Sequence, residues 1–275
     1  MERRRLTPGA TRKREAIRRL KEGLEQQLFV LHYQPIVEAR DESVASVEAL
    51  LRWRQAPAED HDLEELIWSV ERSPVIVRLE NWTLQHACGD AVAWSKAGLD
   101  GLRVDVNLSA KEFPRADLVR RVRQHLADCG LPSARLGLEI TETSGLREFD
   151  AVAEQIERLM AMGIELWLDD FGTGHSSLEW LRRLPLTGVK IPGAFVEGLP
   201  EETRSRAIVA RVIDLAHDLG LRVVAEEVET EAQRDFLAGH GCDLYQGFLF
   251  HAPMPAAGLV RALATTAGAR AATRS

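Results

Sequence analysis

Two hydrophobic patterns alternate along most of this chain. From residue 29 onward, short apolar runs rich in β-branched residues are separated by longer stretches whose apolar residues recur every three or four positions. The short runs are typical of buried strands and the longer ones of amphipathic helices. Strands are predicted at 29–37, 44–53, 103–109, 135–142, 164–169, 188–191, 222–227 and 244–249. Helices are predicted at about 63–72, 78–97, 115–128, 148–162, 176–183, 203–219 and 230–240.

The alternation predicts an α/β fold with a single closed (β/α)8, TIM-like barrel. Eight strands with intervening helices and no linker-like stretch favour one barrel, and 275 residues suit that size. Glycines follow several predicted helices, where a left-handed residue commonly ends a helix. These glycines are Gly98, Gly130, Gly163, Gly220 and Gly241.

An amphipathic helix is predicted at 13–28, ahead of the barrel. Its apolar residues recur at helical spacing with charges between them, at Ile17, Leu20, Leu24 and Leu28. It could be a linker, a docking helix or a short coiled coil, and a cap packed on the main domain is favoured. We therefore divide the chain into a basic tail and helix at 1–28, the barrel at 29–258, and an Ala-rich C-terminal helix or tail at 259–275.

The charge of the chain is uneven. The formal net charge is −7, but residues 1–28 carry +5 and the remainder therefore −12. An acidic body argues against DNA as a partner, because phosphate backbones attract basic surfaces. No stretch approaches the ~18 apolar residues of a membrane span, and no apolar run follows the charged start. We expect a cytoplasmic protein without a membrane span, whose three cysteines are free thiols.

Polar side chains follow strand after strand at the predicted C-terminal ends. They are Glu48 and Arg52, Asn107, Glu139 and Glu142, Asp169 and Asp170, Lys190, Glu226 and Glu229, and Gln246. In a (β/α)8 barrel these strand ends meet at one face, where active sites are built. The sequence therefore predicts six or more acidic groups in one pocket.

Such a cluster of carboxylates points to bound cations. Like charges a few ångströms apart raise each other's pKa or attract counter-ions, and oxygen-only ligands favour Mg²⁺ or Mn²⁺, with Ca²⁺ as a further option. The histidines form no H-E-x-x-H motif, which argues against zinc. Singly, each residue has an ordinary explanation: Arg52 could pair with Glu48, and Lys190 could be a surface lysine. Polar residues at seven consecutive strand ends favour a shared site.

The ordered motifs resemble a known family, the EAL phosphodiesterases specific for cyclic di-GMP. The resemblance runs from about Phe29 to Pro255. It rests on Tyr33-Gln34-Pro35-Ile36, Glu48-Ala49-Leu50-Leu51-Arg52-Trp53, Val106-Asn107-Leu108-Ser109, Glu139-Ile140-Thr141-Glu142, Asp169-Asp170-Phe171-Gly172-Thr173-Gly174, Val189-Lys190-Ile191, Val224-Ala225-Glu226 with Val228-Glu229-Thr230, and Gln246-Gly247. Glu-Ala-Leu alone carries no weight, whereas the full ordered set is highly specific.

The resemblance implies two divalent cations, Mg²⁺ or Mn²⁺, and assigns ligands to each. The first cation would take Glu48, Asn107, Glu139 and Asp169. The second would take Asp169, Asp170 and Glu226, with Asp169 bridging. Two metals ~3.5–4 Å apart can lower the pKa of a bridging water and clamp the attacking and leaving oxygens.

The resemblance also assigns roles to residues that hold no metal. Glu142 resembles the acid that orders the loop after strand five, and Lys190 the residue that activates the attacking water. Arg52 resembles a phosphate ligand and Gln34 a substrate contact, while Glu229 and Gln246 match site positions with less certain roles. We expect the cations to depress the pKa of Lys190, which would make a neutral amine available as a base.

The implied function is hydrolysis of cyclic di-GMP to linear pGpG, in bacterial second-messenger signalling that regulates biofilm formation or motility. The implied fold is a modified barrel with an antiparallel first strand. A homodimer is expected by analogy, and a regulatory protein partner is a further possibility.

Three positions depart from the family pattern: Pro192 replaces an Asp, Glu227 a Gly and His175 a Tyr. Pro192 removes a carboxylate from the strand face that carries Lys190. An impaired EAL-like module, acting as a cyclic di-GMP sensor or a protein-interaction scaffold, is therefore the main alternative. A metal-dependent proton abstractor with Lys190 as base is a more distant one.

Overall fold

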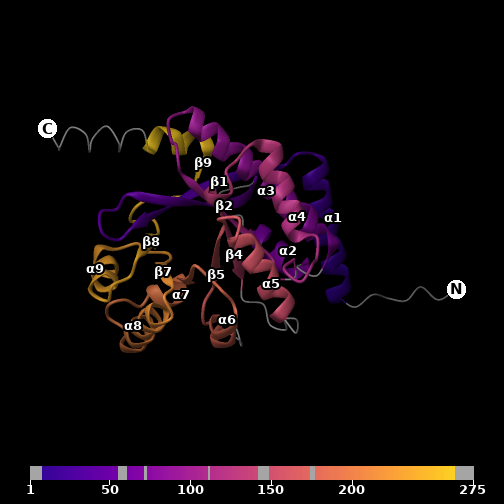
Figure 1. Ribbon diagram of the computed structural model, residues 1–275. Coiled ribbons are helices and arrows are strands. Elements are labelled where there is room, and N and C mark those ends of the chain that lie inside the picture. Colours follow the sequence, from indigo (N-terminus) through magenta and orange to yellow (C-terminus); the bar gives the residue numbers. More distant parts are fainter. Residues whose placement is uncertain are drawn as a thin grey trace.

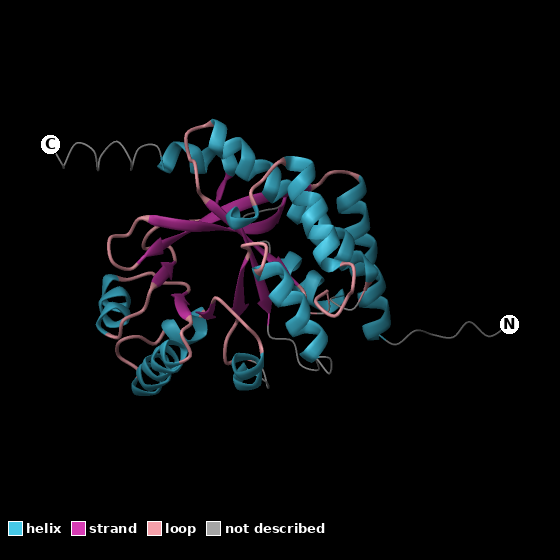
Figure 2. Ribbon diagram, in the orientation of Figure 1, coloured by secondary structure: helices cyan, strands magenta, loops and turns pink. Residues whose placement is uncertain are grey.

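Eight strands close into a barrel, as the sequence predicts. The computed structural model describes residues 8–54, 61–70, 73–110, 112–141, 149–173 and 177–263. The sheet order is β2-β3-β4-β5-β6-β7-β8-β1, and pairing of β1 with β2 closes the ring. The strands are β1 (Phe29–Glu38), β2 (Val44–Trp53), β3 (Arg103–Leu108), β4 (Leu136–Thr141), β5 (Glu165–Asp169), β6 (Gly188–Ile191), β7 (Arg222–Ala225) and β8 (Leu244–Gln246). Figure 2 shows these strands at the centre of the molecule with helices outside them.

The first strand runs against its neighbours. β1 pairs antiparallel with both β2 and β8, whereas the pairs from β2 to β8 are parallel. The modified barrel with an antiparallel first strand is therefore confirmed. A short ninth strand, β9 (Met254–Pro255), adds to β1 and was not predicted.

The predicted helices are present, with shifted ends. They are α2 (His61–Val70), α3 (Pro74–Lys96), α4 (Leu118–Cys129), α5 (Phe149–Met160), α6 (Ser177–Arg183), α8 (Thr203–Asp218) and α9 (Glu231–Gly239). The helix α3 begins four residues before the prediction because Pro74 occupies its first turn, where proline is well tolerated. A one-turn helix, α7 (Gly193–Val196), follows β6 and was not predicted. Residues 256–263 are helical, so the C-terminal helix begins three residues before the boundary expected at 259.

Strand β8 ends earlier than its hydrophobic run. The apolar residues continue to Phe250, but the chain turns after Gln246. At Gly247 a Cβ atom would overlap the backbone of Val228, so the chain passes this point only as glycine. Leu249 and Phe250 pack against the main core from the turn. The prediction of a strand over 244–249 is therefore wrong beyond Gln246.

The N-terminal helix α1 (Pro8–Glu25) packs against the side of the barrel (Figure 1). Its buried residues Ala16 and Leu20 join Phe29, Leu63 and Leu79 in a second hydrophobic cluster beside the main core. Burying an apolar face in this way stabilises a helix that would be marginal alone. The helix is therefore packed on the main domain rather than standing apart from it. Within the described residues, no helix is both long and apolar enough to cross a membrane.

A tryptophan fills the barrel below the strand ends. Trp167 of β5 packs with Ile36, Val224 and Leu244 inside the barrel. Below it, the buried Arg103 guanidinium lies 5.7 Å from the Trp167 ring centroid and donates to Asp105 at 2.8 Å. At Gly188, an added Cβ would overlap the same ring. This layer of side chains therefore fills the barrel beneath the polar strand ends.

Candidate active site

Lys190 is the centre of the polar strand ends. Its side chain is 1% exposed and extends from β6 into the barrel mouth. The Nζ atom lies 3.0 Å from Glu48 Oε2, 2.9 Å from Glu139 Oε2, 3.7 Å from Asp169 Oδ1 and 2.7 Å from Glu226 Oε1. Carboxylates from β2, β4 and β5 and from the residue after β7 thus face a single ammonium group. This agrees with the expectation that the C-terminal ends of barrel strands meet at one face.

The negative charge in this cluster exceeds what one ammonium can balance. Burial, followed by repulsion from neighbouring carboxylates, raises the pKa of Asp169 to about 6 and that of Glu226 to about 8. The same causes raise the pKa of Glu139 well above its usual range. Burial also raises the pKa of Asp170. A site that forces carboxylates toward their protonated forms is suited to hold additional cations.

Lys190 itself shifts in the direction opposite to the one expected beside cations. Burial acts to lower its pKa, but Asp169, Glu139, Glu226 and Glu48 together raise it well above the usual value. Among the described residues, the groups that pair with Lys190 are carboxylates, so its side chain is a protonated ammonium. The expected neutral amine requires that the carboxylate charge be balanced by something else.

Amide groups hold Glu48 in place. Asn107 donates from Nδ2 to Glu48 Oε1 at 2.8 Å, and Gln246 donates from Nε2 to Glu48 Oε2 at 2.7 Å. Burial opposes ionisation of Glu48, but Lys190 and these hydrogen bonds keep its pKa below the usual value. Glu48 is therefore fixed as an oriented carboxylate, as a metal ligand needs to be.

Gln34 lies directly across from Glu48 in the β1–β2 pair. Its Oε1 accepts from Gln246 Nε2 at 3.2 Å, and its Nε2 donates to the backbone oxygen of His251 at 3.1 Å. The involvement of His251 through its backbone leaves no signal in the sequence, because any residue could supply that oxygen.

Three carboxylates at the ends of β5 and β7 could hold a cation together. Asp169, Asp170 and Glu226 each offer one oxygen, and these oxygens lie within 4.8 Å of one another. Asp170 adopts a left-handed backbone conformation, with φ of 56°. The backbone N–H of the next residue, Phe171, donates to the backbone oxygen of Lys190 at 3.2 Å. This contact ties the loop after β5 to the strand that carries the lysine.

The other predicted site residues are less closely engaged. Arg52 is half-buried and donates to the backbone oxygen of Leu51 at 2.8 Å. No ion pair joins it to Glu48 in the described part of the chain, so its charge is not used there. Glu229 is exposed at the turn before α9. Glu142 and His175 lie outside the described residues.

The two described departures from the family pattern lie side by side. Pro192 is buried and precedes α7 in extended conformation. Glu227 adopts a left-handed conformation, with φ of 52°, and its side chain lies over Gly193, where a Cβ would overlap its carboxylate. The backbone therefore requires the positive φ for which glycine is best suited, and Glu227 adopts it at a cost in strain. The Glu227 side chain extends across the end of β6 from an exposed position.

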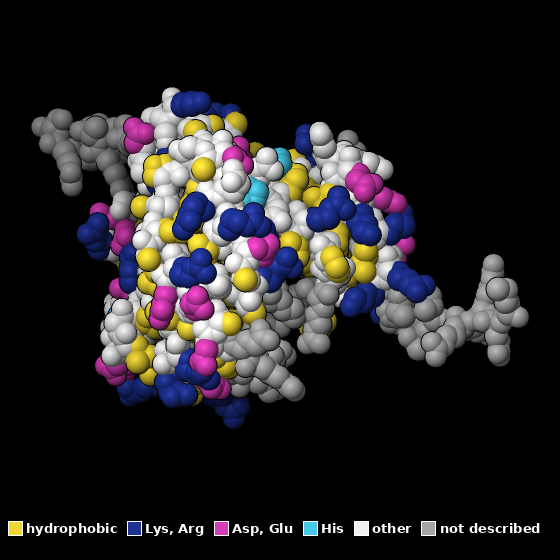
Figure 3. Space-filling model, turned by 45° about the vertical axis from the view of Figure 1, so that its right-hand side comes forward, with side chains coloured by type: hydrophobic (Ala, Val, Ile, Leu, Met, Phe, Trp, Pro, Cys, Tyr) yellow, Lys and Arg dark blue, Asp and Glu magenta, His cyan; other side chains and the backbone are white. Residues whose placement is uncertain are grey.

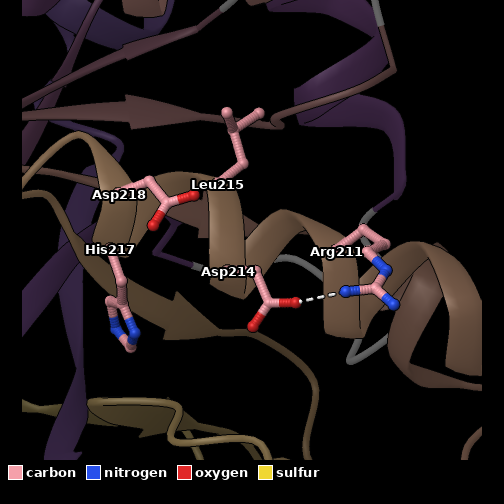
Figure 4. Close-up of a pocket in the computed structure, with 5 residues that line it drawn as sticks. All are labelled: Arg211, Asp214, Leu215, His217 and Asp218. Atoms are coloured by element: carbon pink, nitrogen blue, oxygen red, sulfur yellow. Dashed lines mark hydrogen bonds and ion pairs between the residues drawn. The ribbon is translucent and has the colours of Figure 1, made fainter.

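A separate concavity lies on α8, among surface residues. Its volume is about 440 Å³, and its lining residues are Arg211, Asp214, Leu215, His217 and Asp218. Figure 4 shows that the ion pair drawn there joins Arg211 to Asp214, within one helix. Its five lining residues all come from α8, so it does not combine groups from several strand ends. Figure 3 shows basic, acidic and hydrophobic side chains interspersed on one face of the molecule.

Comparison with known proteins agrees with this arrangement. The EAL domain family matches residues 17–253. The chain is 41% identical over 248 residues to the bifunctional diguanylate cyclase/cyclic di-GMP phosphodiesterase MucR of Pseudomonas aeruginosa, covering 89% of this chain and 36% of MucR. It is 40% identical over 256 residues to the cyclic di-GMP phosphodiesterase NbdA of the same organism, covering 93% of this chain and 33% of NbdA. The chain thus spans about a third of the length of these relatives.

Solved structures show the same fold. The PaMucR phosphodiesterase in complex with c-di-GMP matches with a TM-score of 0.80 at 40% identity, covering 89% of this chain and 99% of that one. The EAL enzyme Bd1971, bound to cAMP and cyclic di-GMP, matches with a TM-score of 0.85 at 25% identity, covering 93% and 70%. With its barrel, its carboxylate cluster and a match over most of its length, the chain belongs to the EAL domain family.

Proposed function

We propose that this chain hydrolyses cyclic di-GMP to linear pGpG, using two divalent cations, Mg²⁺ or Mn²⁺. The observation that carries the proposal is the buried cluster around Lys190, in which the carboxylates of four strands face a single ammonium. Relatives that act on cyclic di-GMP, together with a related structure bound to it, support this choice of substrate.

The described residues supply oxygen ligands for the two cations of this proposal. Asp169, Asp170 and Glu226 would hold one of them through oxygens that already lie close together. Glu48, Asn107 and Glu139, with Asp169 shared, would hold the other. Bound cations would balance the carboxylate charge, polarise the phosphodiester and lower the pKa of water.

Lys190 would then take the proton from the attacking water at its Nζ atom. Its pKa is raised here because the surrounding carboxylates are not balanced. Once cations neutralise those carboxylates, burial favours the uncharged amine. Water adds to phosphorus and the P–O3′ bond breaks, the 3′ oxygen takes up a proton from solvent to become a hydroxyl, and the linear dinucleotide retains a 5′ phosphate.

Arg52 would bind a phosphate of the substrate, because its guanidinium forms no ion pair among the described residues and lies on the strand that carries Glu48. Gln34 and Gln246 would line the same side of the site through their contacts with Glu48 and with each other. We retain Glu142 and Glu229 as candidate site residues on the family resemblance alone.

The decisive experiment incubates the purified chain with cyclic di-GMP and Mn²⁺ or Mg²⁺ and follows pGpG by chromatography. EDTA should abolish product formation, and Asp169→Asn should reduce it to background because it removes a ligand shared by both cations. Asp214→Asn on α8 is the matched control and should keep wild-type activity. Undiminished turnover in excess EDTA, or in Asp169→Asn, would contradict the proposed site.

A catalytically impaired module is the second candidate, favoured by the strained Glu227 and by Pro192 beside it. This alternative gives binding of cyclic di-GMP without pGpG in the same experiment. Calorimetric titration with cyclic di-GMP in the presence of Ca²⁺ distinguishes this sensor from a scaffold that does not bind the dinucleotide.

A further inference from the structure

Two cysteines lie on α3 and α4, the helices that come before and after β3. Cys88 is buried in α3, and Cys129 is half-buried as the last residue of α4. The two helices pack side by side (Figure 1). Cys88 belongs to the main hydrophobic core, and Cys129 packs against its edge. The hydrolysis proposed above uses neither thiol.

Contacts between the two helices place these thiols opposite each other. Asn81 Oδ1 of α3 accepts from Arg121 Nη1 of α4 at 3.0 Å and lies 3.4 Å from His125 Nε2. Both helices connect parallel strands, so they run in the same direction. Cys88 follows Asn81 by seven positions, two turns along the same helix face. Cys129 follows His125 by four positions, so it continues the face that meets α3.

The ionisation of Cys88 agrees with this placement. Burial raises the pKa of its thiol above the usual range, and the neighbouring Cys129 thiol raises it further. A disulfide requires two cysteines whose side chains already lie next to each other. Cys88 and Cys129 meet that requirement from two packed helices. Cys242, the third cysteine, is buried elsewhere, with its Sγ 3.4 Å from the backbone oxygen of Leu244.

The two thiols differ in their access to an oxidant. Cys129 is half-buried beside the exposed Gly130, whereas Cys88 is 0% exposed. A peroxide therefore reaches Cys129 first, and its sulfur takes one oxygen to become a sulfenic acid while the rest of the peroxide leaves as water. The Cys88 sulfur then attacks the Cys129 sulfur. An S–S bond forms, the S–O bond breaks, and the oxygen leaves with the Cys88 proton as a second water.

We propose that Cys88 and Cys129 form a site of oxidative modification, at which a peroxide converts the two thiols into a disulfide between α3 and α4. The link closes a loop that contains β3, the strand whose Asn107 donates to Glu48. A cross-link stabilises the folded chain because it restricts the unfolded one. The reaction needs no cyclic di-GMP, so it is independent of the proposed hydrolysis.

The test oxidises the folded chain with hydrogen peroxide, then denatures it and blocks the remaining thiols with N-ethylmaleimide. Peptide mass spectrometry without reductant should find the peptides of Cys88 and Cys129 joined, lighter by the hydrogens lost from the two thiols. Cys242 should carry the N-ethylmaleimide label. Thermal unfolding followed by circular dichroism should give a Tm about 5–15 °C higher for the oxidised chain than for the reduced one.

Single substitutions separate the two roles. In Cys88→Ala, dimedone should label Cys129, because its sulfenic acid finds no second thiol. In Cys129→Ala, the buried Cys88 should stay reduced. Cys242→Ala is the matched control and should form the link as wild type does.

Three results in the wild-type chain would overturn the proposal, and they decide it even where a variant fails to fold. The first is dimedone on Cys129 without a link to Cys88. The second is a disulfide that joins Cys129 of two chains. The third is a Tm that the confirmed link leaves unchanged.

Discussion

Replacing Lys190 with methionine tests whether its ammonium is what holds the carboxylate cluster together. The side chain is 1% exposed, and its Nζ lies within 4 Å of four carboxylates. Lys190→Met keeps the length and apolar stem of the side chain but leaves those carboxylates without a counter-charge. Breaking a buried ion pair by removing one partner costs about 3–5 kcal/mol.

The loss should depend on pH and on cations. For a domain somewhat smaller than this one, 1 kcal/mol shifts Tm by about 2–4 °C, so a decrease of about 6–20 °C is expected at pH 8 in EDTA. At pH 5 the decrease should be smaller, because protonated carboxylates need no counter-charge. Mn²⁺ should raise the Tm of the variant more than that of wild type, because the cation replaces the missing positive charge.

Thermal unfolding followed by circular dichroism measures these shifts. Lys96→Met is the matched control, because Lys96 is exposed at the end of α3. Its Tm should stay within about 1 °C of wild type, as for most surface substitutions. A Lys190→Met variant as stable as wild type in EDTA at pH 8 would refute the claim that the ammonium balances the cluster.

Three further outcomes follow from packing, strain and ionisation. Gly188→Ala places a methyl group against the buried Trp167 ring, so chemical denaturation should show a free energy of unfolding lower by about 1–3 kcal/mol. Gly89→Ala in α3, where nothing lies near an added Cβ, should instead raise the free energy of unfolding by up to about 1 kcal/mol. Equal effects of the two substitutions on stability would contradict the packing at Gly188. Glu227→Gly removes the strain of a positive φ and should raise Tm. Glu231→Gly in α9 should instead lower Tm, because glycine is a poor helix former. A lower Tm in both variants would show that the left-handed conformation of Glu227 is not strained. Burial raises the pKa of Glu226 to about 8 from a usual 4.5, so the folded chain retains a proton that the unfolded chain releases, and the free energy of unfolding in EDTA should fall as pH rises from about 5 to about 8. Glu226→Gln should reduce this dependence, and an unchanged slope would contradict the assigned pKa.

The elements and the convergence of polar side chains at one face could be predicted from sequence because both follow from local pattern. Runs of buried residues mark strands, and in a parallel barrel every strand ends at the same face. A carboxylate near the C-terminal end of such a run therefore has a predictable destination, as Glu139 in β4 and Asp169 at the end of β5 show. The family motifs added which of these groups are proposed as metal ligands.

Only the tertiary structure decided how those groups contact one another. Strand register and side-chain packing brought Lys190 into the middle of four carboxylates, and the direction of its pKa shift in this structure depends on that geometry. The left-handed Glu227 and the early end of β8 at Gln246 also arise from contacts with distant segments, around Gly193 and Val228. Such contacts join residues far apart in sequence, and no local pattern records them because they form only once the barrel has closed and brought those segments together.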